Sequence, residues 1–379
     1  MRNPPLGLYI HIPWCVQKCP YCDFNSHGVK SAIPEKEYVS HLLDDLALDA
    51  QRVPQRSVST IFFGGGTPSL FSEDAIATLL AGVRERIPLT EDAEITLEAN
   101  PGTVETGRFS GYVQAGVNRI SIGVQSFQQK HLQALGRIHD AAQAQHAITQ
   151  AHQAGLQSFN IDLMHGLPDQ RIDNAMEDLA TAIALKPHHL SWYQLTIEPN
   201  TPFYSRPPEL PDDDVLWDIQ AKGHDVLMQA GYQQYEISGY SKPGYQCQHN
   251  LNYWRFGDYI GIGCGAHGKI TDTTNNTITR TVKTKHPRGY MDITRPYLDQ
   301  ATNVQQDDLA FEFFMNRFRL VEPCPIDDFT LLTGTHLTAA QQAALDDAQR
   351  QGLLTISQTH WQVTEKGRRY LNSLLSCFV

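Results

Sequence analysis

The sequence predicts an α/β fold: an incomplete (β/α)6 barrel, open on one side, followed by a C-terminal winged-helix-like α+β module. Two observations lead to this prediction. Six apolar, β-rich runs recur before residue 200, and stretches with helical periodicity lie between them. From about residue 301 the composition shifts to helices that precede a short hairpin. Strand–helix alternation of this length implies parallel strands joined by right-handed crossovers.

The expected strands are the apolar runs, at residues 8–12, 60–63, 94–98, 119–124, 158–163 and 190–196. The helical spacing of apolar side chains predicts helices around residues 38–46, 76–83, 141–154 and 172–186. Six strand–helix units, rather than the eight of a closed barrel, favour a barrel that is incomplete. A doubly wound sheet is the alternative that the same alternation allows.

Composition divides the chain into three parts. Residues 1–230 hold the barrel, and residues 231–300, rich in Gly, Asn and Tyr, are expected to be irregular with short strands. Residues 301–379 are expected to form helices near 307–320, 325–333 and 338–351, a hairpin of 353–356 with 361–363, and a last helix from Glu365. Winged-helix modules often bind DNA, but this part holds six Lys and Arg against nine Asp and Glu. We therefore expect it to pack against the barrel or cap it.

The overall composition is that of an ordinary globular protein, with 41% hydrophobic and 19% charged residues in a chain of 379. A formal net charge of -11 argues against nucleic acid or an anionic membrane surface as a general partner. The sequence shows neither a signal-peptide core nor an apolar stretch long enough to cross a bilayer. Seven cysteines, three of them crowded together, predict metal-binding thiols in a reducing cytoplasm rather than a disulfide framework.

The three crowded cysteines are Cys15, Cys19 and Cys22, in the pattern C-x3-C-x2-C directly after the first expected strand. Thiolates suit a [4Fe–4S] cluster, and three of them leave the fourth iron open to a ligand that is not protein. The position fits as well, since α/β barrels carry their active sites at the C-terminal ends of the strands. Zinc is the alternative, because it needs a closed tetrahedral shell. Its fourth ligand would be one of three neighbours, His11, Asp23 or His27.

This cysteine pattern, with Tyr21 just before the third cysteine, resembles the signature of the radical S-adenosylmethionine (SAM) superfamily. The resemblance implies that SAM binds the open iron through its methionine amino and carboxylate groups. It also implies that the reduced cluster cleaves SAM to methionine and a 5′-deoxyadenosyl radical. A [4Fe–4S] cluster and SAM are therefore the expected cofactors.

The run GGGTP at residues 64–68 directly follows the second expected strand. Glycine lets the backbone approach a ligand closely, and no Gly-Lys-Ser/Thr follows that would make a phosphate loop. Taken alone, the run is typical of a tight strand-to-helix turn. Downstream of the cysteine loop it resembles the GGGTP motif of the superfamily, whose backbone meets the amino group of SAM. The resemblance assigns SAM contacts to Gly65, Gly66 and Thr67.

The resemblance extends to six side chains at or near the strand ends: Tyr9, Tyr21, Glu98, Gln125, Arg137 and Asp162. Tyr9 and Tyr21 resemble aromatic residues that contact SAM. Glu98 and Asp162 could accept hydrogen bonds from the ribose hydroxyls, and Arg137 could bind the methionine carboxylate in a bidentate fork. Each charged residue alone is more often a solvated or paired side chain, but their shared placement at strand ends favours a binding site.

Longer segments narrow the resemblance to the coproporphyrinogen oxidase group, and within it to the heme chaperone branch. They include HIPWCVQKCPYCDFNS, FFGGGTPSL, GVNRISIGVQSF and QHNLNYWRFGDYIGIGCGAHG, and they reach to about residue 268. Oxygen-independent coproporphyrinogen III oxidases carry a further cysteine where Phe24 stands, and a longer N-terminal extension. The resemblance therefore implies a chaperone that passes heme to acceptor proteins, such as membrane respiratory proteins. The alternative is the oxidase, or another SAM-radical oxidoreductase of porphyrin metabolism.

The expected heme site is the run QHNLNYW at residues 248–254, which resembles the H-N-x-x-Y-W motif of the chaperone branch. Imidazole is a common axial ligand of heme iron, so His249 receives that role, and Tyr253 and Trp254 could lie against the porphyrin face. Taken alone, a histidine beside aromatic residues is more often a hydrogen-bonded core or surface residue. Cys247 and His267 are rival ligands for the heme iron.

Overall fold

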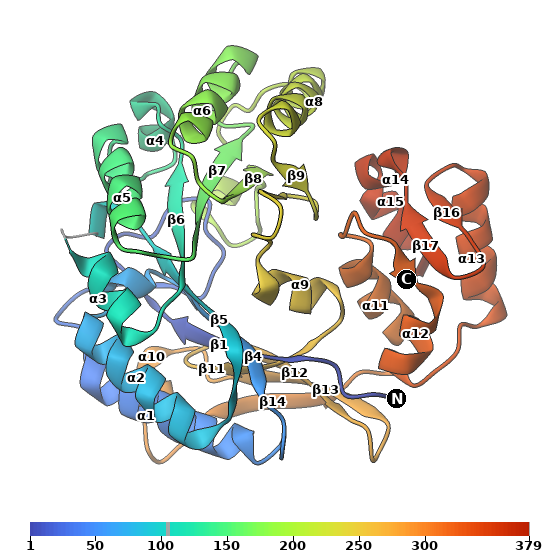
Figure 1. Cartoon of the computed structure of the whole chain (residues 1–379), viewed down its shortest axis with the longest axis horizontal. Coiled ribbons are helices and arrows are strands. Elements are labelled where there is room, and N and C mark those ends of the chain that lie inside the picture. The colour runs from blue at the N-terminus through green and yellow to red at the C-terminus, as the bar shows by residue number, and fades with distance from the viewer. Residues whose placement is uncertain (104–106, 379) are drawn as a thin grey trace.

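The structure, a computed structural model, describes residues 1–103 and 107–378 of the chain. Within these residues, twelve strands form one mixed sheet in the order β14-β13-β12-β11-β1-β4-β5-β6-β7-β8-β10-β9. Figure 1 shows helices packed along the sheet and the C-terminal module, in red, set to one side. The outermost strands of this sheet, β14 and β9, do not pair with each other, so the barrel is open.

Six of these strands are the parallel strands of the barrel, and they neighbour one another in chain order. They are β1 (Leu6–Ile12), β4 (Val58–Gly65), β5 (Leu89–Ala99), β6 (Arg119–Gln125), β7 (Ser158–His165) and β8 (His189–Gln194). Each overlaps the strand expected at its place, which confirms the incomplete barrel. A doubly wound sheet is excluded, because its strand order reverses part-way, whereas here the order runs in one direction.

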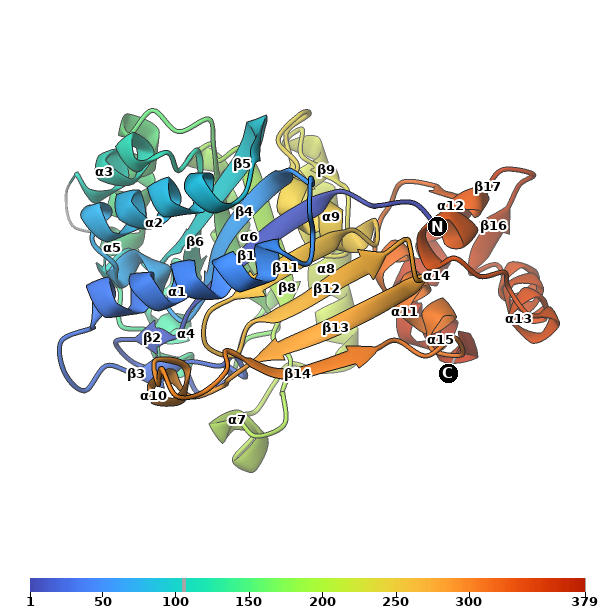
Figure 2. The ribbon, with the colours of Figure 1, turned by 90° about the horizontal axis from the view of Figure 1, so that it is seen from below.

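Helices return the chain between the parallel strands and cover the outer face of the sheet (Figures 1 and 2). They are α1 (Glu35–Ala50), α2 (Glu73–Arg86), α3 (Arg108–Ala115), α4 (Gln129–Ala134), α5 (Ala141–Gln153) and α6 (Ile172–Ala184). After β8 follow the short α7 (Pro202–Ser205), which projects from the sheet in Figure 2, and α8 (Asp213–Gln229), which packs against α6. The four helices expected from the sequence are α1, α2, α5 and α6. The sequence analysis missed α8, although its buried residues Ile219, Gly223 and Leu227 have helical spacing.

Side chains on each barrel strand alternate between the helix-covered face and the barrel interior. On β1, Leu8, Ile10 and Ile12 are fully buried in the main apolar core. Tyr9 and His11 point to the opposite face, into the barrel, where the Tyr9 hydroxyl lies 3.1 Å from His11 Nδ1. The interior of the barrel is therefore the place where polar and aromatic side chains gather.

The segment 231–300, expected to be irregular with short strands, instead extends the sheet on both sides. It forms β9 (Gln233–Gln234), β10 (Gly239–Ser241), α9 (Gln248–Trp254), β11 (Asp258–Ile262), β12 (His267–Asp272), β13 (Thr277–Lys283), α10 (Pro287–Tyr290) and β14 (Leu298–Asn303). β11 pairs in parallel with β1, and β12–β14 follow as an antiparallel extension. In β12 and β13 the hydrophobic pattern is interrupted by buried lysines, which pair as Lys269–Asp258 at 3.0 Å and Lys283–Asp49 at 2.8 Å.

The C-terminal module has the expected order of helices and hairpin, and its described part ends at residue 378. It consists of α11 (Leu309–Arg317), β15 (Cys324–Pro325), α12 (Ile326–Thr333), α13 (Ala339–Arg350), β16 (Leu354–Ile356), β17 (His360–Val363), α14 (Glu365–Arg369) and α15 (Leu371–Leu375). A core of its own includes Phe313, Phe314 and Trp361. Among the helices of residues 1–103 and 107–378, none is long and apolar enough to cross a membrane.

Helix α9 lies between the barrel and this module in Figure 1. On the module side, the Arg319 guanidinium lies 4.3 Å from the centre of the Trp254 ring. Just after α9, Arg255 forms a bidentate ion pair with Glu322, at 2.8 and 2.7 Å. The run predicted to bind heme therefore sits at the junction of the two parts.

Candidate functional site

A cavity of about 500 Å³ opens at the C-terminal ends of the barrel strands. Eleven of the twelve residues expected to hold the cluster and SAM line it: Cys15, Cys19, Cys22, Tyr21, Gly65, Gly66, Thr67, Glu98, Gln125, Arg137 and Asp162. They come from loops and strand ends far apart in the sequence. We call this space the thiol cavity.

The cysteine loop leaves β1 and is held by two short strands, β2 (Trp14–Cys15) and β3 (His27–Gly28), which pair with each other. All three thiols face the thiol cavity and are half-buried. Within the described residues, no three His, Cys, Asp or Glu side chains converge closely enough to hold one metal ion. A single zinc ion needs that convergence, whereas in a [4Fe–4S] cluster each thiolate binds a different iron. Three thiols on one loop match the set of thiolates that a [4Fe–4S] cluster uses.

Of the side chains that could complete a zinc site, His11 is already engaged, whereas the Nε2 atom of His27 is buried without a hydrogen-bond partner among the described residues. The Nε2 atom of His11 lies 2.8 Å from the carbonyl oxygen of Asn25, and its Nδ1 atom faces the Tyr9 hydroxyl. Burial lowers the pKa of His11 to about 4, so the ring is neutral at physiological pH. With both ring nitrogens bonded within the protein, His11 offers no lone pair to a metal.

The thiols have polar neighbours suited to thiolate ligands. Burial raises the pKa of Cys15 and of Cys22 above the ordinary thiol value. The Thr67 hydroxyl donates to the Cys15 sulfur at 3.5 Å, and the Arg137 guanidinium donates to the Cys19 sulfur at 3.6 Å. These donors favour a negative charge on sulfur, which metal binding requires.

The glycine turn after β4 fits closely against the start of the cysteine loop. The backbone N–H of Gly66 donates to the Ile12 carbonyl at 2.7 Å, and that of Thr67 donates to the Trp14 carbonyl at 2.8 Å. Gly65 has a φ of 113°, and a Cβ atom there would lie 2.4 Å from the His11 ring. A side chain at either glycine would push the turn away from the loop. The GGGTP run therefore forms one rigid wall of the cavity together with the cysteine loop.

Two half-buried carboxyl groups, Glu98 and Asp162, also line the cavity, and Glu98 is hydrogen-bonded to the backbone of Gly65. Burial, together with the nearby charge of Asp162, raises the pKa of Glu98 to about 8. Burial also raises the pKa of Asp162, although hydrogen bonds from Asn160, Ser191 and Ser121 act against that rise. Both groups are suited to hydrogen bonding with ligand hydroxyls at neutral pH.

The guanidinium of Arg137 is partly committed to the protein. Its Nη2 donates to the Gly123 carbonyl at 2.6 Å and its Nη1 faces the Cys19 sulfur, while its Nε is buried without a hydrogen-bond partner among the described residues. The Nε–H and the second hydrogens of Nη1 and Nη2 are therefore the donors left for a ligand anion. The guanidinium thus keeps enough N–H groups for the bidentate fork that the sequence suggested.

Gln125 is held in place by a residue that the sequence analysis missed. The Tyr193 hydroxyl donates to Gln125 Oε1 at 2.9 Å, and Gln125 itself has a φ of 70°. A backbone in this region is unusual for glutamine and is typical of functional sites. The signal for Tyr193 was its position near the end of the sixth strand, beside Gln194, which also lines the cavity.

Tyr9 differs from the other expected SAM residues, because it does not line the thiol cavity. Its ring stacks on Phe62, with centroids 6.4 Å apart, and Phe62 in turn stacks on His249 at 5.1 Å. Tyr9 thus belongs to the barrel interior beneath the cavity and supports His11 there.

The three residues expected to contact heme lie on α9, at the other end of the barrel interior. His249 is 1% exposed, with its Nδ1 atom 2.8 Å from the Thr60 hydroxyl and its Nε2 atom 2.8 Å from the Tyr253 hydroxyl. Burial lowers the pKa of His249 to about 3. Both ring nitrogens are therefore engaged, and His249 as placed here does not fit an axial ligand of heme iron.

The N-terminus of α9 is also fixed by the barrel. Glu94 of β5 accepts the backbone N–H groups of Gln248 and His249, at 3.0 and 3.1 Å, and the Cys247 thiol at 3.5 Å. A carboxylate at a helix N-terminus stabilises the helix. We call these contacts, with those of Thr60 and Tyr253 to His249, the α9 seat.

The two rival heme ligands have different surroundings. Cys247 is buried, and this burial raises the pKa of its thiol to about 12, which disfavours a thiolate. His267, at the start of β12, is exposed. Of the side chains proposed for heme iron, His267 is thus the one that solvent reaches directly.

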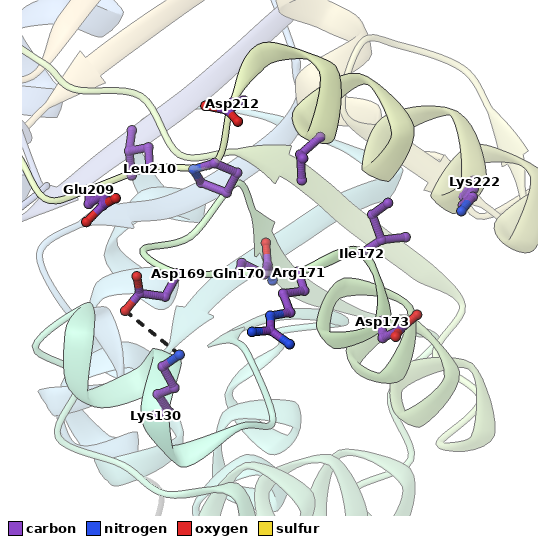
Figure 3. Close-up of a pocket in the computed structure, with 12 residues that line it drawn as sticks. Lys130, Asp169, Gln170, Arg171, Ile172, Asp173, Glu209, Leu210, Asp212 and Lys222 are labelled. Carbon is purple, nitrogen blue, oxygen red and sulfur yellow. Dashed lines mark ion pairs between the residues drawn. The ribbon is translucent and has the colours of Figure 1, made fainter.

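A second hollow, of about 710 Å³, lies between α4, α6 and α8 (Figure 3). Its lining mixes both signs of charge, with Lys130, Arg171 and Lys222 facing several acidic residues, and Lys130 pairs with Asp169 at 3.8 Å. The residues expected to hold the cofactors lie elsewhere. The thiol cavity is therefore the better candidate for the functional site.

Comparisons with known proteins agree with this assignment. A family model described as "Radical SAM superfamily" matches residues 9–179, and one described as "HemN C-terminal domain" matches residues 304–370. Over 379 residues the chain is 61% identical to the heme chaperone HemW of Escherichia coli, covering 100% of this chain and 99% of that one. This chain belongs to the HemW family of radical SAM proteins. The HemW of Haemophilus influenzae is 58% identical over 382 residues, covering 100% of this chain and 99% of that one.

Among solved structures, the coproporphyrinogen III oxidase HemN of Escherichia coli, described as a radical SAM enzyme, superimposes with a TM-score of 0.84. The match covers 99% of this chain and 90% of that one, at 24% identity. An identity this low shows a shared fold. Membership of the HemW family and the predicted fold class are thus both confirmed.

Proposed function

We propose that this protein is a heme chaperone that holds a [4Fe–4S] cluster and SAM in the thiol cavity and passes heme to acceptor proteins from the cytoplasm. The observation that carries this proposal is the convergence of three thiols and the GGGTP turn on one cavity, in a chain that is 61% identical end to end to a protein named a heme chaperone. Membrane respiratory proteins are the acceptors that we propose.

In this proposal Cys15, Cys19 and Cys22 each bind one iron. Arg137 faces both the Cys19 sulfur and the cavity, so it would place its charge beside the carboxylate of SAM. Glu98 and Asp162 would receive the ribose hydroxyls. When bound, the reduced cluster supplies one electron to the sulfonium of SAM.

Support for heme comes from the names of the relatives and not from the α9 seat. Contact between heme iron and His249 requires both hydrogen bonds of the ring to open. His267 remains the exposed alternative.

The proposal is tested by anaerobic reconstitution of the full chain with iron and sulfide, followed by titration with SAM and then with heme. We expect one cluster, one SAM and one heme per chain. Parallel titrations of His249→Ala and His267→Ala would show which substitution abolishes the change in the Soret band. Reconstituted protein that binds neither SAM nor heme would contradict the proposal.

The second candidate is an oxygen-independent coproporphyrinogen III oxidase, which the HemN-like fold allows. Phe24, 59% exposed at the mouth of the cavity, stands where those oxidases carry a further cysteine. Reconstituted protein should therefore form little protoporphyrinogen from coproporphyrinogen III and SAM. Rapid formation would replace the chaperone function with the oxidase.

A further inference from the structure

A chain of buried polar groups crosses the barrel interior from the thiol cavity to the α9 seat. Asn160 Nδ2 donates to Asp162 Oδ1 at 2.7 Å, and Asn160 Oδ1 lies 2.7 Å from Nδ1 of His189. The Nε2 atom of His189 lies 2.7 Å from the Tyr235 hydroxyl, which accepts the backbone N–H of Cys247 at 3.3 Å. His189 is the middle of this chain, and it is 1% exposed.

The direction of these hydrogen bonds follows from one backbone group. The N–H of Ser191 lies 2.9 Å from Asn160 Oδ1, and a backbone N–H can only donate. The amide atom that faces it is therefore oxygen, and the amide nitrogen faces Asp162. His189 must then donate from Nδ1 to the same amide oxygen.

The protonation state of His189 fixes the other half of the chain. Burial, with the nearby charge of Arg119, lowers the pKa of His189 well below its ordinary value, so the ring is neutral. A neutral ring that donates from Nδ1 must accept at Nε2, which means that Tyr235 donates its hydroxyl proton to His189. The Tyr235 oxygen is then free to accept the N–H of Cys247.

Every donor in the chain thus has one acceptor, from Cys247 at the start of α9 to the Asp162 carboxylate. Asn160 also donates to the Ser121 hydroxyl at 2.7 Å, and that hydroxyl donates to Asp162 Oδ2 at 3.2 Å. Asp162, which lines the thiol cavity, is therefore oriented by Asn160 and by the Ser121 hydroxyl that Asn160 itself contacts, with Ser191 as a third donor.

We propose that His189 is a positioning residue that orients Asp162 for SAM through Asn160 and, through Tyr235, links SAM binding to the seat of α9. The inference rests on the proposed role of the thiol cavity as the SAM site. A ligand bound to Asp162 restricts the motion of the hydrogen-bonded groups that connect Asp162 with the N-terminus of α9. The expected coupling is reciprocal, so loosening α9 weakens SAM binding.

Two substitutions of His189 each remove one of the two hydrogen bonds that its imidazole ring makes. In His189→Asn the amide nitrogen takes the place of Nδ1, so the bond to Asn160 remains and the bond to Tyr235 is lost. In His189→Gln the amide oxygen takes the place of Nε2, so the bond to Tyr235 remains and the bond to Asn160 is lost. Tyr235→Phe removes the same link as His189→Asn without touching the ring.

The experiment uses anaerobically reconstituted full-length protein and two measurements. The first is the Kd for SAM, and the second is the rate at which a maleimide alkylates Cys247, mapped by mass spectrometry. Cys247 is 1% exposed, so its reaction reports opening of the α9 seat, and the exposed Cys377 serves as the internal reference.

In the wild type, saturating SAM should slow alkylation of Cys247 at least about fivefold. His189→Gln should raise the Kd for SAM about tenfold, as expected for one lost hydrogen bond to a buried network. His189→Asn and Tyr235→Phe should bind SAM within about threefold of the wild type, yet show no effect of SAM on Cys247.

The inference fails if SAM leaves the alkylation rate of wild-type Cys247 unchanged, or if the Asn and Gln variants behave alike. It also fails if His189→Asn and Tyr235→Phe keep the full SAM effect. A wild type that does not bind SAM overturns the proposed function itself, which separates the two failures.

Discussion

The two ends of the barrel interior differ in how their polar groups are satisfied. In the thiol cavity, Arg137 Nε has no partner among the described residues, and the Glu98 carboxyl keeps its proton up to about pH 8. In the α9 seat, Glu94 caps a helix and both ring nitrogens of His249 are bonded. Unsatisfied and strained groups are typical of a ligand site, whereas satisfied ones are typical of a folded core. The unsatisfied groups at the first end support the proposed cofactor site, whereas the second end is occupied by the protein's own helix α9.

The largest effect that we expect is loss of the iron–sulfur cluster when one of the three thiols is replaced. Cys19→Ser should remove nearly all of the cluster, measured as iron content and visible charge-transfer absorbance after anaerobic reconstitution, because thiolate ligands hold the irons. The far-ultraviolet circular dichroism should stay unchanged. Cys377→Ser, at an exposed cysteine, is the matched control and should keep full iron content. Retention of the cluster in Cys19→Ser would refute the assignment of three thiolates.

Substitution of His249 in the α9 seat should lower the free energy of unfolding. His249→Ala leaves the hydroxyls of Thr60 and Tyr253 without their partner, and unfolding should become easier by about 2–3 kcal/mol. Urea denaturation of the protein without cofactors measures this loss. His146→Ala, at an exposed helix position, should change stability by less than about 0.5 kcal/mol. Equal unfolding free energies for the two variants would contradict the claim that the hydrogen bonds of His249 stabilise the fold.

Glu98 in the thiol cavity should make the free energy of unfolding depend on pH. The pKa of Glu98 is about 8 in the folded chain, against an ordinary value of 4.5. Between these values the folded chain binds the extra proton, so stability falls as pH rises, by up to about 1.4 kcal/mol per pH unit. Glu98→Gln cannot ionise, and its unfolding free energy between pH 5 and 8 should fall less steeply than that of the wild type. Parallel pH curves for both proteins would contradict the raised pKa.

The smallest effect is expected where the barrel meets the C-terminal module. The side chains of Arg255 and Glu322 are 48% and 37% exposed, and exposed ion pairs contribute little because water screens them. Arg255→Ala should lower the free energy of unfolding by about 0.5 kcal/mol at low salt and by less at high salt. Thermal unfolding measures this change. A loss several times larger would show that this pair, rather than α9, holds the two parts together.

The sequence could predict the barrel and the thiol cavity because their signals are local. The spacing of Cys15, Cys19 and Cys22, the glycine run and the period of six strands each lie within a few residues. The positions of Tyr9 and His249 could not be read in the same way, because alternation on a strand does not say what covers the inner face. Residues 231–300 were expected to hold only short strands, and the regular strands β12 and β13 were not recognised because Lys269 and Lys283 read as exposed until their acidic partners are known.

The pairing of β1 has a consequence for synthesis of the chain. One edge of β1 pairs with β4, but the other pairs with β11, whose residues emerge from the ribosome more than half a chain later. At typical translation speeds this edge stays bare for on the order of tens of seconds. A nascent chain stalled in that interval presents a free apolar strand, which makes it a natural client for chaperones that guard against aggregation.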